Sequence, residues 1–167
     1  MAGILARKKQ YFKITRYKYN KAPKTPNNLT INIFAAKIPA MTLYTSYFSF
    51  VHQIPPQHLV SIAGAVPPGF PGTQYRKLAP KYDWWKKWHD EKLSNEWYIE
   101  KYYDTVLNKL NPIDVATTLG DNKILLCWES PEKFCHRHIV AEWLTKSGIM
   151  VSELTVTQKE KFINKLL

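Results

Sequence analysis

Three consecutive segments near the C-terminus alternate between strand and helix patterns, and this alternation constrains the fold most strongly. KILLCW (123–128) is a continuous apolar run, typical of a central strand that is covered on both faces. Ser130 and Gly148 suit the two ends of a helix over residues 131–146, and IMVSEL (149–154) predicts another strand. The order strand–helix–strand predicts a βαβ unit with parallel pairing.

The residues before this unit contain strand patterns followed by helix patterns. β-branched and aromatic residues predict strands in TINIFAAKI (30–38), TLYTSYFSFV (42–51) and HLVSIAGAV (58–66). Apolar residues at helical spacing then predict three helices, the first with Trp84, Trp85 and Trp88, the second capped by Ser94, the third between Pro112 and Gly120. The tryptophans form either a core face or a base-stacking platform. We predict an α/β fold of three layers, with a Rossmann-like, mixed or mostly parallel sheet and helices on both faces.

The chain is expected to form a single domain, because 167 residues suffice for one hydrophobic core. The α/β core domain is predicted over residues 42–154. A C-terminal helix within residues 155–167 is expected to pack on this core, and Thr157 with Glu160 has the spacing of a capping box. Residues 1–41 are expected to form a basic arm or edge strands.

The positive charge is concentrated in the first half of the chain. The net charge is +11, and residues 1–82 contain 12 Lys or Arg with no Asp or Glu. Residues 83–167 contain 12 basic and 13 acidic residues, so this half is nearly neutral. In residues 1–28, basic residues alternate with Tyr and Phe, as in segments that contact phosphates and stack on bases. The asymmetry favours an anionic partner, either a small molecule or nucleic acid, although a basic tail that maintains solubility gives the same composition.

Composition also argues against several classes of protein. No apolar run approaches the roughly 20 residues of a membrane-spanning helix, and the N-terminus lacks the pattern of a signal peptide. Two cysteines do not make a disulfide framework. We therefore expect a cytoplasmic protein with no membrane partner.

Reactive side chains gather between residues 127 and 138. Glu129 follows the central strand at its carboxyl end, which is where open α/β sheets bind ligands. On a helix that starts at residue 131, His136 points toward the sheet, whereas Cys135 and Arg137 lie about 100° to either side of it. Because Cys127 and Cys135 are far apart for a short metal-binding pair, we expect no metal and no cofactor.

Two catalytic arrangements remain open. Cys135 can serve as a nucleophile beside His136 and Arg137, although no motif identifies its base. Alternatively, Glu129 acts as base or nucleophile, His136 orients it, and Arg137 clamps an anion. A purely structural interpretation also exists, in which Glu129 and Arg137 form an ion pair and His136 is a core histidine.

Several motifs in this order resemble the family called domain of unknown function 488. They are Ser61-Ile62, Pro67 with Phe70, Tyr75 to Pro80, Tyr98 with Tyr102, the run Cys127–Leu144 and Val151–Leu154. The resemblance covers about residues 42–154 and implies a small three-layer α/β domain of bacteria, archaea or their viruses. It implies no activity, but it marks Glu129, Cys135, His136 and Arg137 as the family signature. Trp128 departs from the smaller residue common at its position.

The resulting functional prediction is an enzyme that acts on a nucleotide-like or phosphate-bearing substrate at the carboxyl edge of the sheet. Its predicted catalytic residues are Glu129, Cys135, His136 and Arg137. Its predicted substrate-binding residues are Phe70, Tyr75, Arg76, Tyr98 and Tyr102. The alternative is a non-catalytic nucleotide- or nucleic-acid-binding protein that uses the basic first half.

Overall fold

The computed structural model describes residues 41–166. Five parallel strands form one sheet in the order β3-β2-β4-β1-β5. The strands are β1 (Thr42–Tyr47), β2 (Leu59–Ser61), β3 (Thr73–Gln74), β4 (Lys123–Cys127) and β5 (Met150–Glu153). The helices are α1 (Tyr82–Asp90), α2 (Asn95–Thr105), α3 (Pro112–Leu119), α4 (His136–Lys146) and α5 (Val156–Leu166). The strand predicted at 30–38 and the basic arm of the first 40 residues lie outside the described residues.

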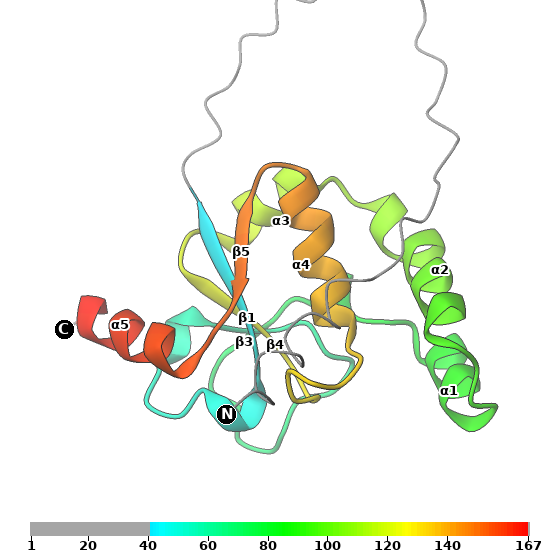
Figure 1. Cartoon of the computed structure of the whole chain (residues 1–167), viewed down its shortest axis with the longest axis horizontal. Coiled ribbons are helices and arrows are strands. Elements are labelled where there is room, and N and C mark those ends of the chain that lie inside the picture. The colour runs from blue at the N-terminus through cyan, green and yellow to red at the C-terminus, as the bar shows by residue number, and fades with distance from the viewer. Residues whose placement is uncertain (1–40, 167) are drawn as a thin grey trace, which may run out of the picture. The chain divides into compact units, whose positions relative to one another are not determined.

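Helices cover both faces of the sheet, so the predicted three-layer α/β fold is confirmed. On one face, Leu125 belongs to the core cluster that includes residues of α1 to α4. Its neighbours Ile124 and Leu126 pack on the opposite face, together with Phe162 of α5. This division follows from the alternation of side chains along a strand. Figure 1 shows α5 on the other side of the strands from α1 and α2.

β4 is the central strand, as its continuous apolar run predicts. Ile124, Leu125 and Leu126 are fully buried. The pairing of the βαβ unit differs from the prediction, because β1 lies between β4 and β5 and pairs in parallel with both. α4 therefore connects β4 and β5, which do not pair with each other but both pair with β1.

The helix ends match the sequence pattern in two cases and depart from it in two others. The Ser94 side chain accepts a hydrogen bond from the Trp97 amide, and Asn111 caps the third helix before Pro112. The last helix is capped by Thr155 with Gln158, two residues before the predicted pair.

The largest departure is the start of α4, at His136 instead of residue 131. Ser130 begins a single turn that does not continue. Phe134 instead packs against the rings of Trp88 and Tyr98, with centroid distances of 5.7 and 5.1 Å. Cys135 is consequently extended, at φ −152° and ψ 141°. Tertiary contacts of this loop thus override the local helix signal.

Candidate functional site

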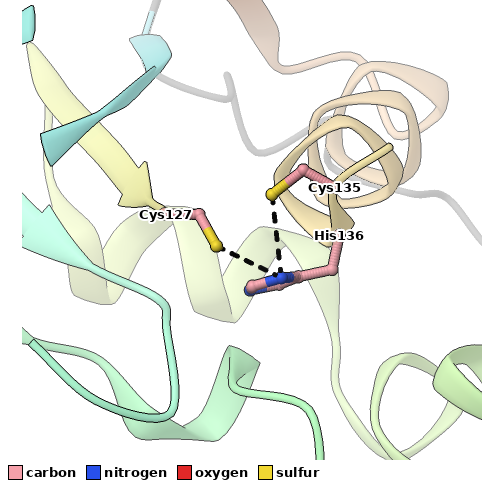
Figure 2. A group of neighbouring side chains, drawn as sticks. All are labelled: Cys127, Cys135 and His136. Atoms are coloured by element: carbon pink, nitrogen blue, oxygen red, sulfur yellow. Dashed lines mark hydrogen bonds between the residues drawn. The ribbon is translucent and has the colours of Figure 1, made fainter. Parts of the chain in front are cut away.

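Cys127, Cys135 and His136 converge at the carboxyl end of β4. Cys127 ends the strand, Cys135 is the residue before α4, and His136 begins that helix. The Nδ1 atom of His136 lies 3.5 Å from the Sγ atom of Cys127 and 4.0 Å from that of Cys135 (Figure 2). All three side chains are at least nine-tenths buried. We call them the thiol–imidazole cluster.

The main chain directly after β2 determines how His136 presents its ring. The Nε2 atom donates to the carbonyl oxygen of Ile62 at 2.9 Å, since a carbonyl can only accept. The Nδ1 atom therefore faces both thiols. It accepts a proton from a thiol when the ring is neutral and donates one to a thiolate when the ring is charged. This arrangement holds the imidazole ready for proton transfer with sulfur.

The two thiols differ in acidity because they contact each other. A hydrogen bond from Cys127, together with nearby His136 and Arg137, lowers the pKa of Cys135 to about 3. The same contact with Cys135, together with burial, raises the pKa of Cys127 well above its usual value. These contacts favour Cys135 as the first of the two thiols to become a thiolate.

A cavity of about 660 Å³ opens over the cluster. Its walls are mainly aromatic: Tyr82, Trp85 and Trp88 from α1, Tyr98 from α2, and Trp128 with Phe134 from the β4–α4 loop. The main-chain bend at residues 63–65 completes the lining, with Pro80 and His89. A volume of this size suits a small organic ligand, and aromatic walls suit a planar one.

Three rings form a row on the cavity side of α1. Trp85 stacks on Tyr82 at 6.0 Å and on His89 at 5.6 Å, with interplanar angles of 28° and 19°. Trp84 is instead buried in the core beside Tyr98. The core-face interpretation therefore holds for Trp84, whereas Trp85 lines the cavity.

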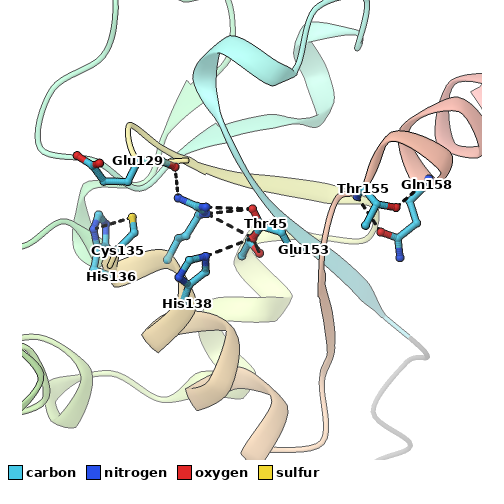
Figure 3. A network of polar contacts seen from close by, with 9 residues as sticks. Thr45, Glu129, Cys135, His136, His138, Glu153, Thr155 and Gln158 are labelled. Atoms are coloured by element: carbon cyan, nitrogen blue, oxygen red, sulfur yellow. Dashed lines mark hydrogen bonds and ion pairs between the residues drawn. The ribbon is translucent and has the colours of Figure 1, made fainter. Parts of the chain in front are cut away.

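Glu129 and Lys133 lie at the rim of the cavity. Their side chains form an exposed ion pair, with 3.7 Å between Oε2 and Nζ. Glu129 lines the same cavity as Cys135 and His136, and Figure 3 shows the three side chains. A carboxylate in this place can exchange protons with a ligand in the cavity.

Arg137 does not line the cavity. Its side chain is fully buried, and it donates from Nε and Nη2 to the Glu153 carboxylate at 3.1–3.3 Å. Its Nη1 atom donates to the main-chain carbonyl of Glu129 (Figure 3). Thr45 and His138 also contact Glu153. The expected anion clamp is therefore corrected: this guanidinium is engaged by protein groups and holds the end of β4 in place.

The predicted substrate-binding residues lie in different surroundings. Tyr98 lines the cavity, and Tyr102 is buried beside His136 at 5.6 Å between ring centroids. Phe70 packs on the opposite face of the sheet, Tyr75 packs against the main core, and Arg76 is exposed beside Gln74. Phe70, Tyr75 and Arg76 are thus not among the residues that line the cavity.

Sequence reasoning also missed the contribution of Cys127. Cys127 was assigned no role, because seven residues separate it from Cys135, too many for a short metal-binding pair. One signal could have revealed this contact. Cys127 ends β4, and the segment that follows, which contains Cys135, begins at the same edge of the sheet.

A family model covers the structural elements that build this site. The model is DUF488-N3a, described as the active DUF488-N3 subclade, and it matches residues 62–148. The chain belongs to the DUF488 family. In this DUF488 protein the match runs from Ile62, which binds His136, through β4 to the end of α4. No curated protein and no solved structure matches the chain.

Within residues 41–166, this DUF488 protein has no helix with the length and apolarity required to cross a membrane.

Proposed function

We propose that this DUF488 protein is an enzyme for a planar substrate of the nucleobase or nucleotide class. The reacting groups are the thiol–imidazole cluster and Glu129. The observation that carries the proposal is the placement of this cluster beneath a cavity of about 660 Å³ with aromatic walls. The word active in the description of the matching family model supports a catalytic role.

The chemistry of the cavity favours a ring over a phosphate as the recognised part. Aromatic side chains bind bases through stacking, which contributes about 1–3 kcal/mol per base. Outside the thiol–imidazole cluster, Lys133 and His89 are the basic side chains of the cavity lining, and Lys133 is paired with Glu129. A phosphate on the substrate would therefore lie at the rim, outside the apolar part of the cavity.

Replacing Trp85 by Ala should weaken ligand binding about fivefold to 150-fold, because it removes one stacking surface. Calorimetric titration with nucleobases, nucleosides and their 5′-monophosphates measures this effect. Trp97→Ala is the matched control, since Trp97 packs against the core outside the cavity. Equal affinities for both variants and the wild type would contradict stacking on Trp85.

The charge distribution favours a second candidate, a nucleic-acid-binding role for the basic first half. Residues 1–82 carry 12 basic and no acidic residues. Such a role needs no cavity chemistry and should depend strongly on salt. The two functions are compatible in one chain if the basic half delivers a nucleic-acid substrate.

Neutralising the basic residues of positions 1–28 should weaken oligonucleotide binding and flatten its salt dependence. For single strands, each lost phosphate contact reduces the slope of log K against log salt by about 0.7. The substitutions to Gln are made at Arg7, Lys8, Lys9, Lys13, Arg16, Lys18, Lys21 and Lys24. Fluorescence anisotropy at several salt concentrations gives the slope, with Glu129→Gln as a variant that should keep it. An unchanged slope in the neutralised chain would exclude this segment as the binding surface.

A further inference from the structure

The donor atoms of the thiol–imidazole cluster have the spacing of a metal site. The two sulfur atoms and a ring nitrogen all lie within 4.8 Å of one another. Tetrahedral zinc with Zn–S of about 2.3 Å and Zn–N of about 2.0 Å separates its ligand atoms by roughly 3.5–3.8 Å. The two distances from His136 Nδ1, 3.5 and 4.0 Å, deviate from that range by a few tenths of an ångström at most. Small side-chain rotations would therefore suffice to close the site.

The surroundings of the cluster also fit a metal. Both cysteines are free thiols, and two sulfurs with one imidazole favour zinc over magnesium or calcium. His136 donates its other ring nitrogen to the Ile62 carbonyl, as histidine ligands usually do to fix their tautomer. Cys135 directly precedes α4, where free amide groups favour a thiolate. Buried Arg137 adds a positive charge that is already neutralised by Glu153.

We propose that Cys127, Cys135 and His136 bind one zinc ion and leave its fourth position open to the aromatic cavity. All three residues line that cavity, so a water or substrate atom can reach the fourth position. Structural zinc sites are closed by four protein ligands, whereas three ligands and an open position are typical of catalytic zinc. The inference rests on the proposed function, because the open position of the zinc would face the cavity in which the substrate is proposed to bind.

A zinc ion beside Glu129 would suit a hydrolysis. A His/Cys/Cys zinc with a glutamate that is not a ligand is the arrangement that activates water in base deaminases. In this chain Glu129 is the carboxylate on the cavity rim. The water oxygen would bond to a ring carbon of the substrate, and Glu129 would take the water proton. The leaving group would depart with the electron pair of the broken bond and receive that proton from Glu129.

Cobalt titration of the full metal-free chain tests the site without reference to activity. We expect one equivalent of Co²⁺ to bind and to produce thiolate-to-cobalt charge-transfer absorption. The same equivalent of Zn²⁺ should displace the cobalt and protect both thiols from alkylation. Cys127→Ser and Cys135→Ser should each lower the absorption per cobalt and weaken binding at least tenfold. His52→Gln, an exposed histidine outside the cavity, should bind as the wild type does.

The wild type decides the question even if a cysteine variant fails to fold, which circular dichroism would reveal. Absence of charge-transfer absorption in folded, fully reduced wild type would overturn the proposal, and so would alkylation of both thiols at an unchanged rate in Zn²⁺. Failure of the proposed function is a separate result. Metal binding without any ligand or turnover would leave the site intact and remove the function. Turnover at full rate in the presence of a chelator would support the proposed function and contradict the metal site.

Discussion

Glu153→Ala should destabilise the protein by about 3–5 kcal/mol, because it leaves a buried guanidinium without its anion. Arg137 has no exposed surface, and Glu153 accepts from it through both carboxylate oxygens. Urea denaturation of the wild type and of Glu153→Ala measures the loss. The slope of the free energy of unfolding against urea concentration should be the same for both proteins, which checks that they unfold to the same extent.

Glu142→Ala is the matched control for this prediction. Glu142 forms a 2.7 Å ion pair with Lys146, but their side chains are 42% and 66% exposed. Exposed pairs contribute at most about 1 kcal/mol, so this variant should remain close to the wild type. A loss for Glu153→Ala that is no larger than for Glu142→Ala would show that the Arg137 network does not stabilise the fold.

The same network connects stability to the site. Arg137 donates to the Glu129 carbonyl at the end of β4, and it adjoins His136 in α4. It therefore holds together the two elements that carry the cluster. In Glu153→Ala we expect the separation of the two thiols to vary, and hence catalysis to fall along with stability.

His136→Gln should lower the rate of substrate conversion at least about 100-fold, because it removes the group that contacts both sulfur atoms. Glutamine retains a side-chain N–H for the Ile62 carbonyl, so the hydrogen bond at 2.9 Å has a replacement. The fold should therefore survive the change. Mass-spectrometric analysis of nucleotides after incubation measures conversion.

His52→Gln provides the comparison for this variant. His52 is exposed and lies outside the cavity, so its replacement should leave the rate unchanged. Conversion that persists undiminished in His136→Gln would place the chemistry elsewhere in the chain.

The central strand β4 was predictable because a buried strand has a recognisable sequence pattern. A strand covered on both faces must be apolar at every position, and KILLCW meets that requirement. The strand order was not predictable, since parallel strands can be joined over a neighbour by the same helix. That β1 lies between β4 and β5 is decided by packing of the whole sheet.

The site was predicted in part, and the errors for Cys135 and Arg137 have one source. His136 does point inward and Glu129 does lie at the strand end, as strand and helix geometry require. The positions of Cys135 and Arg137 were inferred from a helical wheel that began five residues too early. Because residues 129–135 form a loop, Cys135 reaches Cys127 and Arg137 reaches Glu153. The local sequence pattern does not predict how this loop folds back against the strand that precedes it.

The location of a bound substrate tests the central claim most directly. A crystal structure of His136→Gln with a nucleotide that the wild type converts should show the intact substrate in the aromatic cavity. We predict its ring against Trp85, and its reacting carbon within about 3.5 Å of the position that a cluster-bound water or the Cys135 sulfur occupies. A substrate bound outside this cavity, with the cavity empty, would contradict the account.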